Sequence, residues 1–176
     1  MKQTLILGST ILDIIIDVTS LPRTTEDFHI KQQTMVLGAC AFNVQNIVDM
    51  FEILHIFCSL IGTGVYGDFV AKQLSQKSIE PFIRIKDQDS GCCYCYVEPD
   101  GERIFLSYHG AEYTFQENWL KELDMNDFDS AYSCELEVEE STGDNIISFL
   151  KKNSERKICL AVGPRINKID QQKLDE

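Results

Sequence analysis

Residues 37–43 read Leu37-Gly38-Ala39-Cys40-Ala41-Phe42-Asn43 and join an extended segment to a helical pattern. Small residues at such a junction let a ligand approach the backbone closely. The amides of the first helical turn can donate hydrogen bonds to hydroxyl groups, and Asn43 adds both a donor and an acceptor. Taken alone, tight packing of a helix on a sheet, with an asparagine cap, explains the segment better than a ligand site does.

Apolar runs and helical patterns alternate on both sides of this junction. Strands are expected at residues 4–7, 54–61, 80–85, 130–136 and 157–162, and helices at residues 42–51, 68–76, 115–123 and 142–151. Residues 14–18 are expected to continue the first strand. Strands that alternate with helices indicate an α/β fold with a mainly parallel sheet flanked by helices.

Two segments predict a small β lid. Residues 28–37 are extended and show alternation, and residues 92–108 form a hairpin around the turn Pro99-Asp100-Gly101. Such a hairpin is an antiparallel insertion in a parallel fold, and we expect it to project as a lid. The sequence stops where residues 170–176 begin another helix. We therefore expect residues 1–176 to be one portion of a longer domain whose C-terminal part is absent.

The charge of the chain restricts its partners. Its 176 residues carry 16 basic and 28 acidic side chains, which gives a formal net charge of −12. This charge disfavours nucleic acid and anionic membranes as partners. The N-terminal apolar run is broken by Gly8 and Asp13 and is too short to span a membrane.

Three of the seven cysteines, Cys92, Cys93 and Cys95, look at first like a metal cluster. In a strand, however, Cys93 and Cys95 share one face while Cys92 points to the other. Neither a second Cys-x-x-Cys pair nor a flanking histidine completes a set of four ligands. The sequence therefore predicts buried free thiols, no metal site and a cytoplasmic protein.

Residues 8–13 read Gly8-Ser9-Thr10-Ile11-Leu12-Asp13 and follow the first expected strand. Ligands of α/β sheets bind at the carboxyl ends of the strands. The two carboxylate oxygens of Asp13 can accept hydrogen bonds from vicinal hydroxyl groups. An aspartate that only caps a turn explains the same residue, and both interpretations stay open.

Residues 62–67 read Gly62-Thr63-Gly64-Val65-Tyr66-Gly67 and match the Gly-x-Gly-x-x-Gly dinucleotide pattern, with Glu80 at about the distance of a ribose-binding acid. This motif supports an alternative function, that of an NAD(P)-binding oxidoreductase. The pattern normally opens the first strand–helix–strand unit of its domain. Here a strand and a helix precede it, which weighs against the alternative.

Taken in order, these segments resemble the ribokinase-like (PfkB) family of carbohydrate and nucleoside kinases, and the similarity covers nearly all of the 176 residues. Residues 8–13 look like the family's opening motif, in which an aspartate holds substrate hydroxyls. Residues 38–43 are similar to its Gly-Gly-x-x-x-Asn signature. Residues 62–67 resemble its Gly-x-Asp-x-x-Gly turn, and residues 100–103 and 110–112 resemble its lid strands.

Four positions depart from the family pattern. Ala39 replaces the second glycine of the signature, and Gly64 replaces the aspartate of the turn. Glu112 replaces the asparagine of the lid motif, and Ile11 stands where sugar-binding members often have an asparagine. The missing amide at position 11 argues against ribose as the substrate.

The resemblance also implies which residues contact the substrate. They are Asp13, Gly38, Ala39 and Asn43, together with an acid that follows residues 130–134 of the expected strand. We take Glu135 as this acid, and Glu137 is the alternative in a different register. The rest of the acidic run at residues 135–140 is expected to be a solvated loop.

The function that the resemblance implies is an ATP-dependent phosphotransferase acting on the hydroxymethyl group of a sugar or nucleoside. Its cofactors would be ATP with Mg²⁺, and a monovalent cation is compatible with it. In the family, the catalytic base and the nucleotide pocket lie in the C-terminal part, at a Gly-Ala-Gly-Asp segment. No such segment occurs in this sequence. We therefore expect the chain to supply the substrate-binding half, without a catalytic residue, and to be inactive alone.

Two expectations concern association. Two-stranded sheets are marginal alone, so we expect a homodimer that forms through the lid strands. A non-catalytic sugar-binding or dimerisation module is the third functional alternative.

Overall fold

The computed structural model of the chain describes residues 3–163 and 166–175, with all side chains in these ranges except those of Glu135, Leu174 and Asp175. Its main sheet is parallel throughout and has the strand order β10-β9-β1-β4. These strands are β1 (Gln3–Leu7), β4 (His55–Cys58), β9 (Phe128–Cys134) and β10 (Lys157–Ala161). The predicted α/β fold with a parallel sheet is confirmed.

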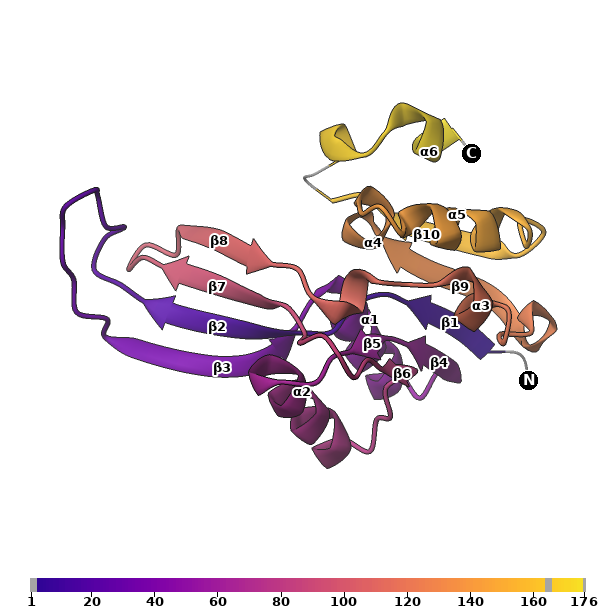
Figure 1. Cartoon of the computed structure of the whole chain (residues 1–176), viewed down its shortest axis with the longest axis horizontal. Helices are drawn as coiled ribbons and strands as arrows, with labels where there is room; N and C mark the ends of the chain where they lie inside the picture. The colour runs from indigo at the N-terminus through magenta and orange to yellow at the C-terminus, as the bar shows by residue number, and fades with distance from the viewer. Residues whose placement is uncertain (1–2, 164–165, 176) are drawn as a thin grey trace.

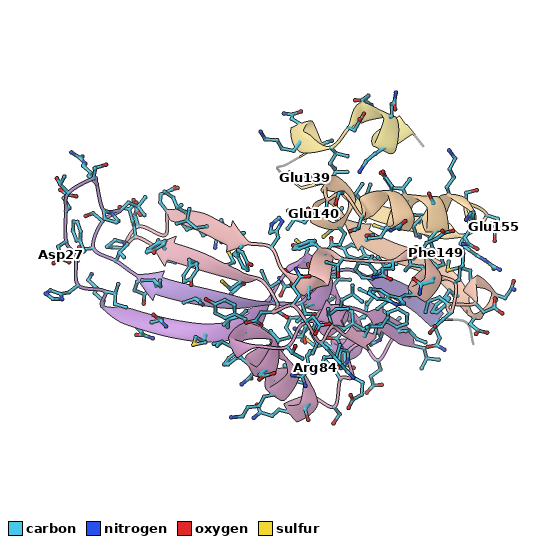
Figure 2. The ribbon with its side chains drawn as sticks, viewed as in Figure 1. Asp27, Arg84, Glu139, Glu140, Phe149 and Glu155 are labelled. Atoms are coloured by element: carbon cyan, nitrogen blue, oxygen red, sulfur yellow. The ribbon has the colours of Figure 1, made fainter. Side chains whose placement is uncertain are left out.

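A second sheet forms the lid, which projects away from the main sheet (Figure 1). Its strand order is β3-β2-β7-β8. These strands are β2 (Ile11–Asp17), β3 (Gln32–Gly38), β7 (Cys92–Val97) and β8 (Arg103–Tyr108). Strand β2 runs antiparallel to β3 and parallel to β7, and β7 and β8 form the predicted hairpin. Asp27 lies in the β2–β3 connection at the far end of the lid (Figure 2).

The remaining elements cover the sheets and connect them. A two-stranded parallel sheet pairs β5 (Leu60–Ile61) with β6 (Ile83–Arg84). The α-helices are α1 (Cys40–Met50), α2 (Val65–Gln76), α3 (Glu117–Leu120), α4 (Glu135–Glu139), α5 (Gly143–Lys151) and α6 (Gln171–Asp175). The 3₁₀ turns are η1 (Ala111–Tyr113), η2 (Met125–Asp127) and η3 (Ile166–Lys168). None of the helices within the described ranges is long and apolar enough to cross a membrane.

The expectation that residues 14–18 continue the first strand is wrong. The chain leaves the main sheet at Gly8 and enters the lid sheet as β2. A side chain at position 8 would lie 2.6 Å from the Cβ of Ala41 and 3.0 Å from Oε1 of Glu137, so only glycine fits this crossing. The expected lid segment at residues 28–37 is also shorter, because pairing in β3 begins at Gln32.

The core has two parts, one on each face of β1. Ile6 packs into one cluster with the base of the lid, α1 and α2, whereas Leu5 and Leu7 pack into the other with α3 and α5. A parallel strand that is covered on both faces reads as a continuous apolar run, as this one does. Strand β2 instead alternates: Leu12 and Ile14 join the first cluster, and Asp13 points to the opposite face.

The thiols fulfil the prediction only in part. Five of the seven cysteines are buried, but Cys40 and Cys159 are exposed. The described residues contain no group of His, Cys, Asp or Glu side chains that could hold a metal ion. Most cysteines therefore act as small apolar core residues.

Ala39 has an unusual backbone conformation at the start of α1, with φ 83° and ψ 156°. This region is favourable only for glycine and costs other residues on the order of 1–3 kcal/mol. We expect Ala39→Gly to raise the free energy of unfolding by about 1 kcal/mol, because relief of strain exceeds the added entropy of the unfolded chain. Urea denaturation measures this change. Ala41→Gly, in the regular first turn of α1, is the control and should destabilise the chain.

Candidate substrate-binding site

Asp13 lies at the base of the lid and contacts Gly38, the last residue of β3, two residues before α1 begins. A side chain at position 38 would overlap the carboxyl group of Asp13. The absence of a side chain at Gly38 therefore leaves the space that this carboxyl group occupies. Burial raises the pKa of Asp13. Asp13 forms no hydrogen bond or ion pair with the residues that the structure describes. Its oxygens are therefore available to a ligand with hydroxyl groups.

The other predicted residues of the signature lie next to this contact. Ala39 is the N-cap residue of α1, and its carbonyl accepts a hydrogen bond from the backbone amide of Asn43 at 3.0 Å. Asn43 is exposed in the first turn of the helix. The structure thus brings Asp13, Gly38 and Ala39 together and leaves the Asn43 amide exposed one turn further on. Their contacts with a substrate stay a prediction.

The acidic segment after β9 differs from the expected solvated loop. Residues 135–139 form α4, and the Glu137 side chain is only 1 % exposed. Oε1 of Glu137 accepts the backbone N–H of Ser9 at 2.6 Å, and Oε2 accepts the thiol of Cys134. The structure therefore places Glu137 against the Gly8 crossing, whereas the Glu135 side chain lies outside the described residues. A substrate contact from Glu135 stays a prediction.

The face of the lid that carries Asp13 is mostly uncharged. Asp13 is paired with Val36 in β3 and with Cys93 in β7. The hydroxyl of Ser107 in β8 donates to the sulfur of Cys93 at 3.5 Å. Cys93 is paired with Asp13, and Cys95 lies two residues further along β7, so both thiols share the face of Asp13. Burial and then the nearby negative charge of Asp13 raise the pKa of Cys95. These surroundings suit a neutral ligand.

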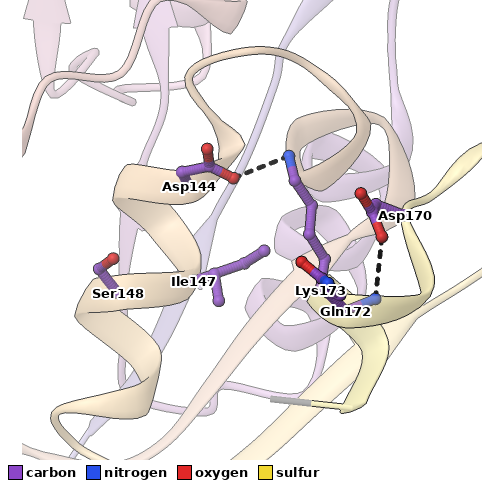
Figure 3. Close-up of a pocket in the computed structure, with 6 residues that line it drawn as sticks. All are labelled: Asp144, Ile147, Ser148, Asp170, Gln172 and Lys173. Carbon is purple, nitrogen blue, oxygen red and sulfur yellow. Dashed lines mark hydrogen bonds and ion pairs between the residues drawn. The ribbon is translucent and has the colours of Figure 1, made fainter.

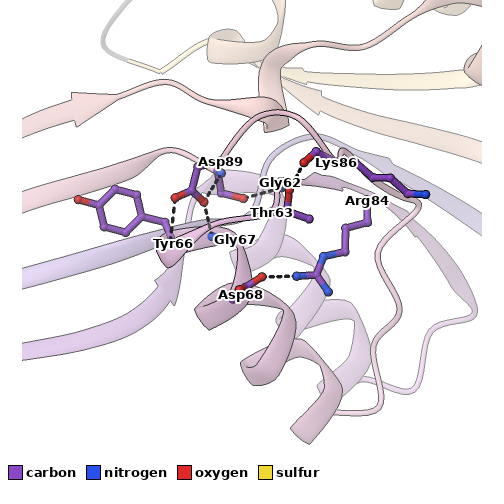
Figure 4. A network of polar contacts seen from close by, with 9 residues as sticks. Gly62, Thr63, Tyr66, Gly67, Asp68, Arg84, Lys86 and Asp89 are labelled. Carbon is purple, nitrogen blue, oxygen red and sulfur yellow. Dashed lines mark hydrogen bonds and ion pairs between the residues drawn. The ribbon is translucent and has the colours of Figure 1, made fainter.

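The glycine turn at residues 62–67 leads into α2, and the carboxylate of Asp89 occupies the start of this helix (Figure 4). The carboxylate accepts the backbone N–H of Gly67 at 2.7 Å and that of Tyr66 at 3.2 Å. A side chain at Gly64 would overlap the same carboxylate. The amides that would bind a dinucleotide phosphate are thus used within the chain, which removes the basis for an NAD(P) site here. Sequence reasoning missed Asp89, because it comes from a loop 22 residues beyond Gly67.

We expect Asp89→Ala to lower the free energy of unfolding by about 2 kcal/mol, because two amides of α2 lose their acceptor. Denaturant unfolding measures the loss. Asp68→Ala is a matched control at the same helix end, because Asp68 forms an exposed ion pair with Arg84 and should change stability little.

NAD and NADP at millimolar concentration should not bind the wild type. Saturable binding of either nucleotide would contradict the assignment of Asp89.

Glu112 connects the two ends of the lid hairpin. Its side chain is fully buried, and its oxygens accept the backbone N–H groups of Gly91 at 2.8 Å and Gly110 at 2.9 Å. Burial raises the pKa of Glu112, and the two backbone hydrogen bonds oppose this shift. At this position, where the resembled family has an asparagine, the glutamate ties the start of β7 to the residues after β8.

A polar hollow of about 340 Å³ lies between α5 and α6 (Figure 3). Lys173 is engaged there, since its Nζ lies 2.9 Å from Oδ1 of Asp144 and donates to the carbonyl of Val138 at 3.0 Å. None of the predicted substrate-binding residues lines this hollow. It is therefore separate from the candidate site.

A parallel α/β layer with a four-stranded lid is the arrangement of a ribokinase-like fold, and the inner lid strand β2 carries Asp13, which has no polar partner among the described residues. The family model described as "pfkB family carbohydrate kinase" matches residues 1–174. The chain belongs to this family.

Individual relatives agree with this assignment. The chain is 26% identical over 168 residues to an uncharacterised sugar kinase, YegV, of Escherichia coli, covering 96% of this chain and 52% of that protein. Ribokinase of Thermotoga maritima superposes with a TM-score of 0.78 at 16% identity, over 98% of this chain and 56% of that one. A nucleoside kinase of Methanocaldococcus jannaschii gives 0.75 at 16% identity, over 99% and 56%. The chain thus spans little more than half the length of these relatives.

Proposed function

We propose that this chain supplies the substrate-binding half of an ATP-dependent phosphotransferase, which acts on the hydroxymethyl group of a neutral sugar or nucleoside. The observation that carries the proposal is the contact between Gly38 and the unpaired, partly buried carboxyl group of Asp13. A carboxylate in this setting accepts strong hydrogen bonds from two neighbouring hydroxyl groups. Family membership supplies the reaction class.

Each part of the site has a role in this proposal. Asp13 accepts hydrogen bonds from the substrate hydroxyls, and the side chain of Asn43 adds a donor and an acceptor at the first turn of α1. The lid covers the bound substrate and excludes water, which limits loss of the phosphoryl group to hydrolysis. The described residues hold no metal cluster, and the Gly62–Gly67 amides are occupied by Asp89. ATP with Mg²⁺, and a compatible monovalent cation, are the cofactors of this proposal, and we assign them no binding residues and no catalytic base among the described residues.

Binding measurements on the chain test the proposal. Isothermal titration with neutral pentoses, hexoses and nucleosides is expected to find a ligand, whereas the corresponding phosphates and sugar acids should not bind. The reason is that the chain carries a net charge of −12 and that the carboxyl group of Asp13 repels an anionic ligand when it is ionised. The full-length protein should consume ATP only in the presence of the neutral ligand. If no neutral sugar or nucleoside binds or stimulates ATP consumption, the proposal is wrong.

We further propose that two copies associate through their lids in a cytoplasmic protein. Apolar side chains are exposed on both faces of the lid: Met35, Val36, Ile104, Phe105, Leu106 and Tyr108. Exposed apolar patches of this kind mark interaction surfaces. The cytoplasmic location is supported by seven cysteines that form no disulfide.

Phe105→Asp is expected to convert the dimer into a monomer, because it places a charge in the apolar contact. Phe105 is 57% exposed. Light scattering at several protein concentrations measures the change. Val65→Asp is the control, because Val65 is 78% exposed but lies on α2, outside the lid. A wild-type chain that stays monomeric at all concentrations would contradict dimerisation.

A further inference from the structure

Three segments meet around Gly8: the first turn of α1, the end of β9 and helix α4. The close approach of Ala41 and Glu137 to Gly8 fixes their arrangement, and α1 packs against β9. Cys40 is the first residue of α1, and Cys134 is the last residue of β9. The fold thus places two thiols and a carboxyl group beside the candidate substrate site.

The two thiols interact directly. A hydrogen bond with Cys40, and then burial, raise the pKa of the Cys134 thiol, which donates to Oε2 of Glu137. Cys134 is only 1 % exposed, whereas Cys40 is open to solvent. The sulfur of Cys40 can therefore react with an oxidant from solution, and the buried sulfur of Cys134 lies next to it.

We propose that Cys40 and Cys134 are a redox pair that forms a reversible disulfide. This disulfide would restrain the substrate-binding segment at residues 38–43 by linking it to β9. Cys40 is the thiol that reacts with the oxidant, because it is exposed and is the first residue of an 11-residue helix, where backbone amides favour a thiolate. Cys134 is the resolving thiol. Its hydrogen bond to Glu137 gives its proton an acceptor.

The reaction balances with hydrogen peroxide as the oxidant. The Cys40 thiolate attacks one peroxide oxygen, the O–O bond breaks, and Cys40 sulfenic acid and hydroxide form. The sulfur of Cys134 then attacks the sulfur of Cys40, and the S–O bond breaks as the S–S bond forms. The Cys134 proton passes to Glu137, and the departing hydroxide takes up a proton to leave as water. A dithiol reductant reverses the change by thiol–disulfide exchange.

The disulfide would alter the site in two ways. It would tie the first residue of α1 to β9, so the segment from Gly38 to Asn43 could no longer adjust to a ligand. It would also remove the thiol that donates to Glu137, while the Ser9 amide continues to donate to that carboxylate. The expected effect on ligand binding rests on the proposed function, whereas the disulfide itself does not.

Mass spectrometry of the chain tests the disulfide. After mild peroxide treatment, the intact chain should lose two hydrogen atoms, and peptide mapping should find Cys40 linked to Cys134. A dithiol should restore the original mass. No linkage, or linkage of a different pair, would overturn the proposal.

Three variants sharpen this test. Cys40→Ser should abolish the linkage, and Cys134→Ser should leave a Cys40 sulfenic acid that dimedone traps. Cys159→Ser is the matched control, because Cys159 is the other exposed cysteine, and it should form the disulfide like the wild type. Loss of the linkage in Cys159→Ser, or its persistence in Cys40→Ser, would refute the pairing.

Ligand titration separates this inference from the proposed function. The oxidised chain should bind the neutral ligand more weakly by roughly 5- to 150-fold, the usual range of coupling between two sites. Equal affinity of the oxidised and reduced chains would refute control of the site by the disulfide. If the reduced chain binds no neutral ligand, the proposed function fails, while the mass measurement still decides whether the redox pair exists.

Discussion

Asp13→Asn is expected to weaken binding of the neutral ligand by at least about 100-fold, as measured by isothermal titration. A carboxylate that accepts two ligand hydroxyls makes two charge-assisted hydrogen bonds, and each contributes on the order of 1.5–3 kcal/mol. The amide keeps the shape of the side chain but replaces one acceptor with a donor. A loss of about 3 kcal/mol corresponds to the expected factor.

The same substitution should make the empty chain more stable at neutral pH. Burial raises the pKa of Asp13 in the folded chain, so folding favours the protonated form. The stability from this group is fully present below the ordinary aspartate pKa and is lost as pH rises through the raised pKa. Asparagine is neutral at every pH and avoids this loss. Thermal unfolding between pH 3 and 8, scanned for both proteins, should show the largest difference at the upper end.

Asp17→Asn is the matched control for both measurements. Asp17 lies on the same strand as Asp13, four residues further on and on the same face, but it is paired with Gln32 at the outer end of the strand. It should change neither ligand affinity nor the pH dependence of stability. Equal effects of the two substitutions would show that the general charge of the lid, and not the Gly38 contact, determines binding.

Glu112→Ala is expected to lower the free energy of unfolding by about 3 kcal/mol. The substitution leaves the buried amides of Gly91 and Gly110 without acceptors and opens a cavity where the side chain was. Each unsatisfied buried donor costs about 1–3 kcal/mol, and the gain from removing a desolvated carboxyl group offsets part of this. Urea denaturation measures the change.

Amide hydrogen exchange locates the effect of Glu112→Ala. Protection should fall most in β7 and β8, because Glu112 holds both ends of that hairpin. Glu102→Ala, at the exposed tip of the same hairpin, should stay within about 0.5 kcal/mol of the wild type. If Glu112→Ala retains wild-type stability and protection, Glu112 does not hold the lid base.

Local patterns in the sequence predicted the repetitive part of the fold well. The amphipathic helix at residues 142–151 and the hairpin at residues 92–108 appear in the structure. The apolar run at residues 54–61, expected as one strand, instead divides into β4 in the main sheet and β5 in the two-stranded sheet. The failure at residues 14–18 has a physical cause. Whether an apolar strand continues or changes sheet depends on how closely Ala41 and Glu137 approach Gly8, and no local pattern contains that contact.

The site was predicted less completely than the fold. The motifs identified Asp13 and Gly38, and the structure brings these two residues into contact. Glu137 and Asp89 received no definite role, because each binds amides that are distant in sequence, those of Ser9 and Gly67. An acidic residue in a polar stretch gives no sign that it is buried, unless the partner that satisfies its oxygens is known.

The passage of the chain from one sheet to the other at Gly8 has a mechanical consequence. It places the carboxyl group of Asp13, the proposed ligand contact, on the lid rather than on the parallel sheet. A ligand that binds Asp13 on one side and the start of α1 on the other would therefore connect the lid to the helix that packs on the parallel sheet. The free energy of ligand binding and the free energy that fixes the orientation of the lid are then coupled. A substitution that weakens either contact with the ligand should also make the lid more mobile in the complex.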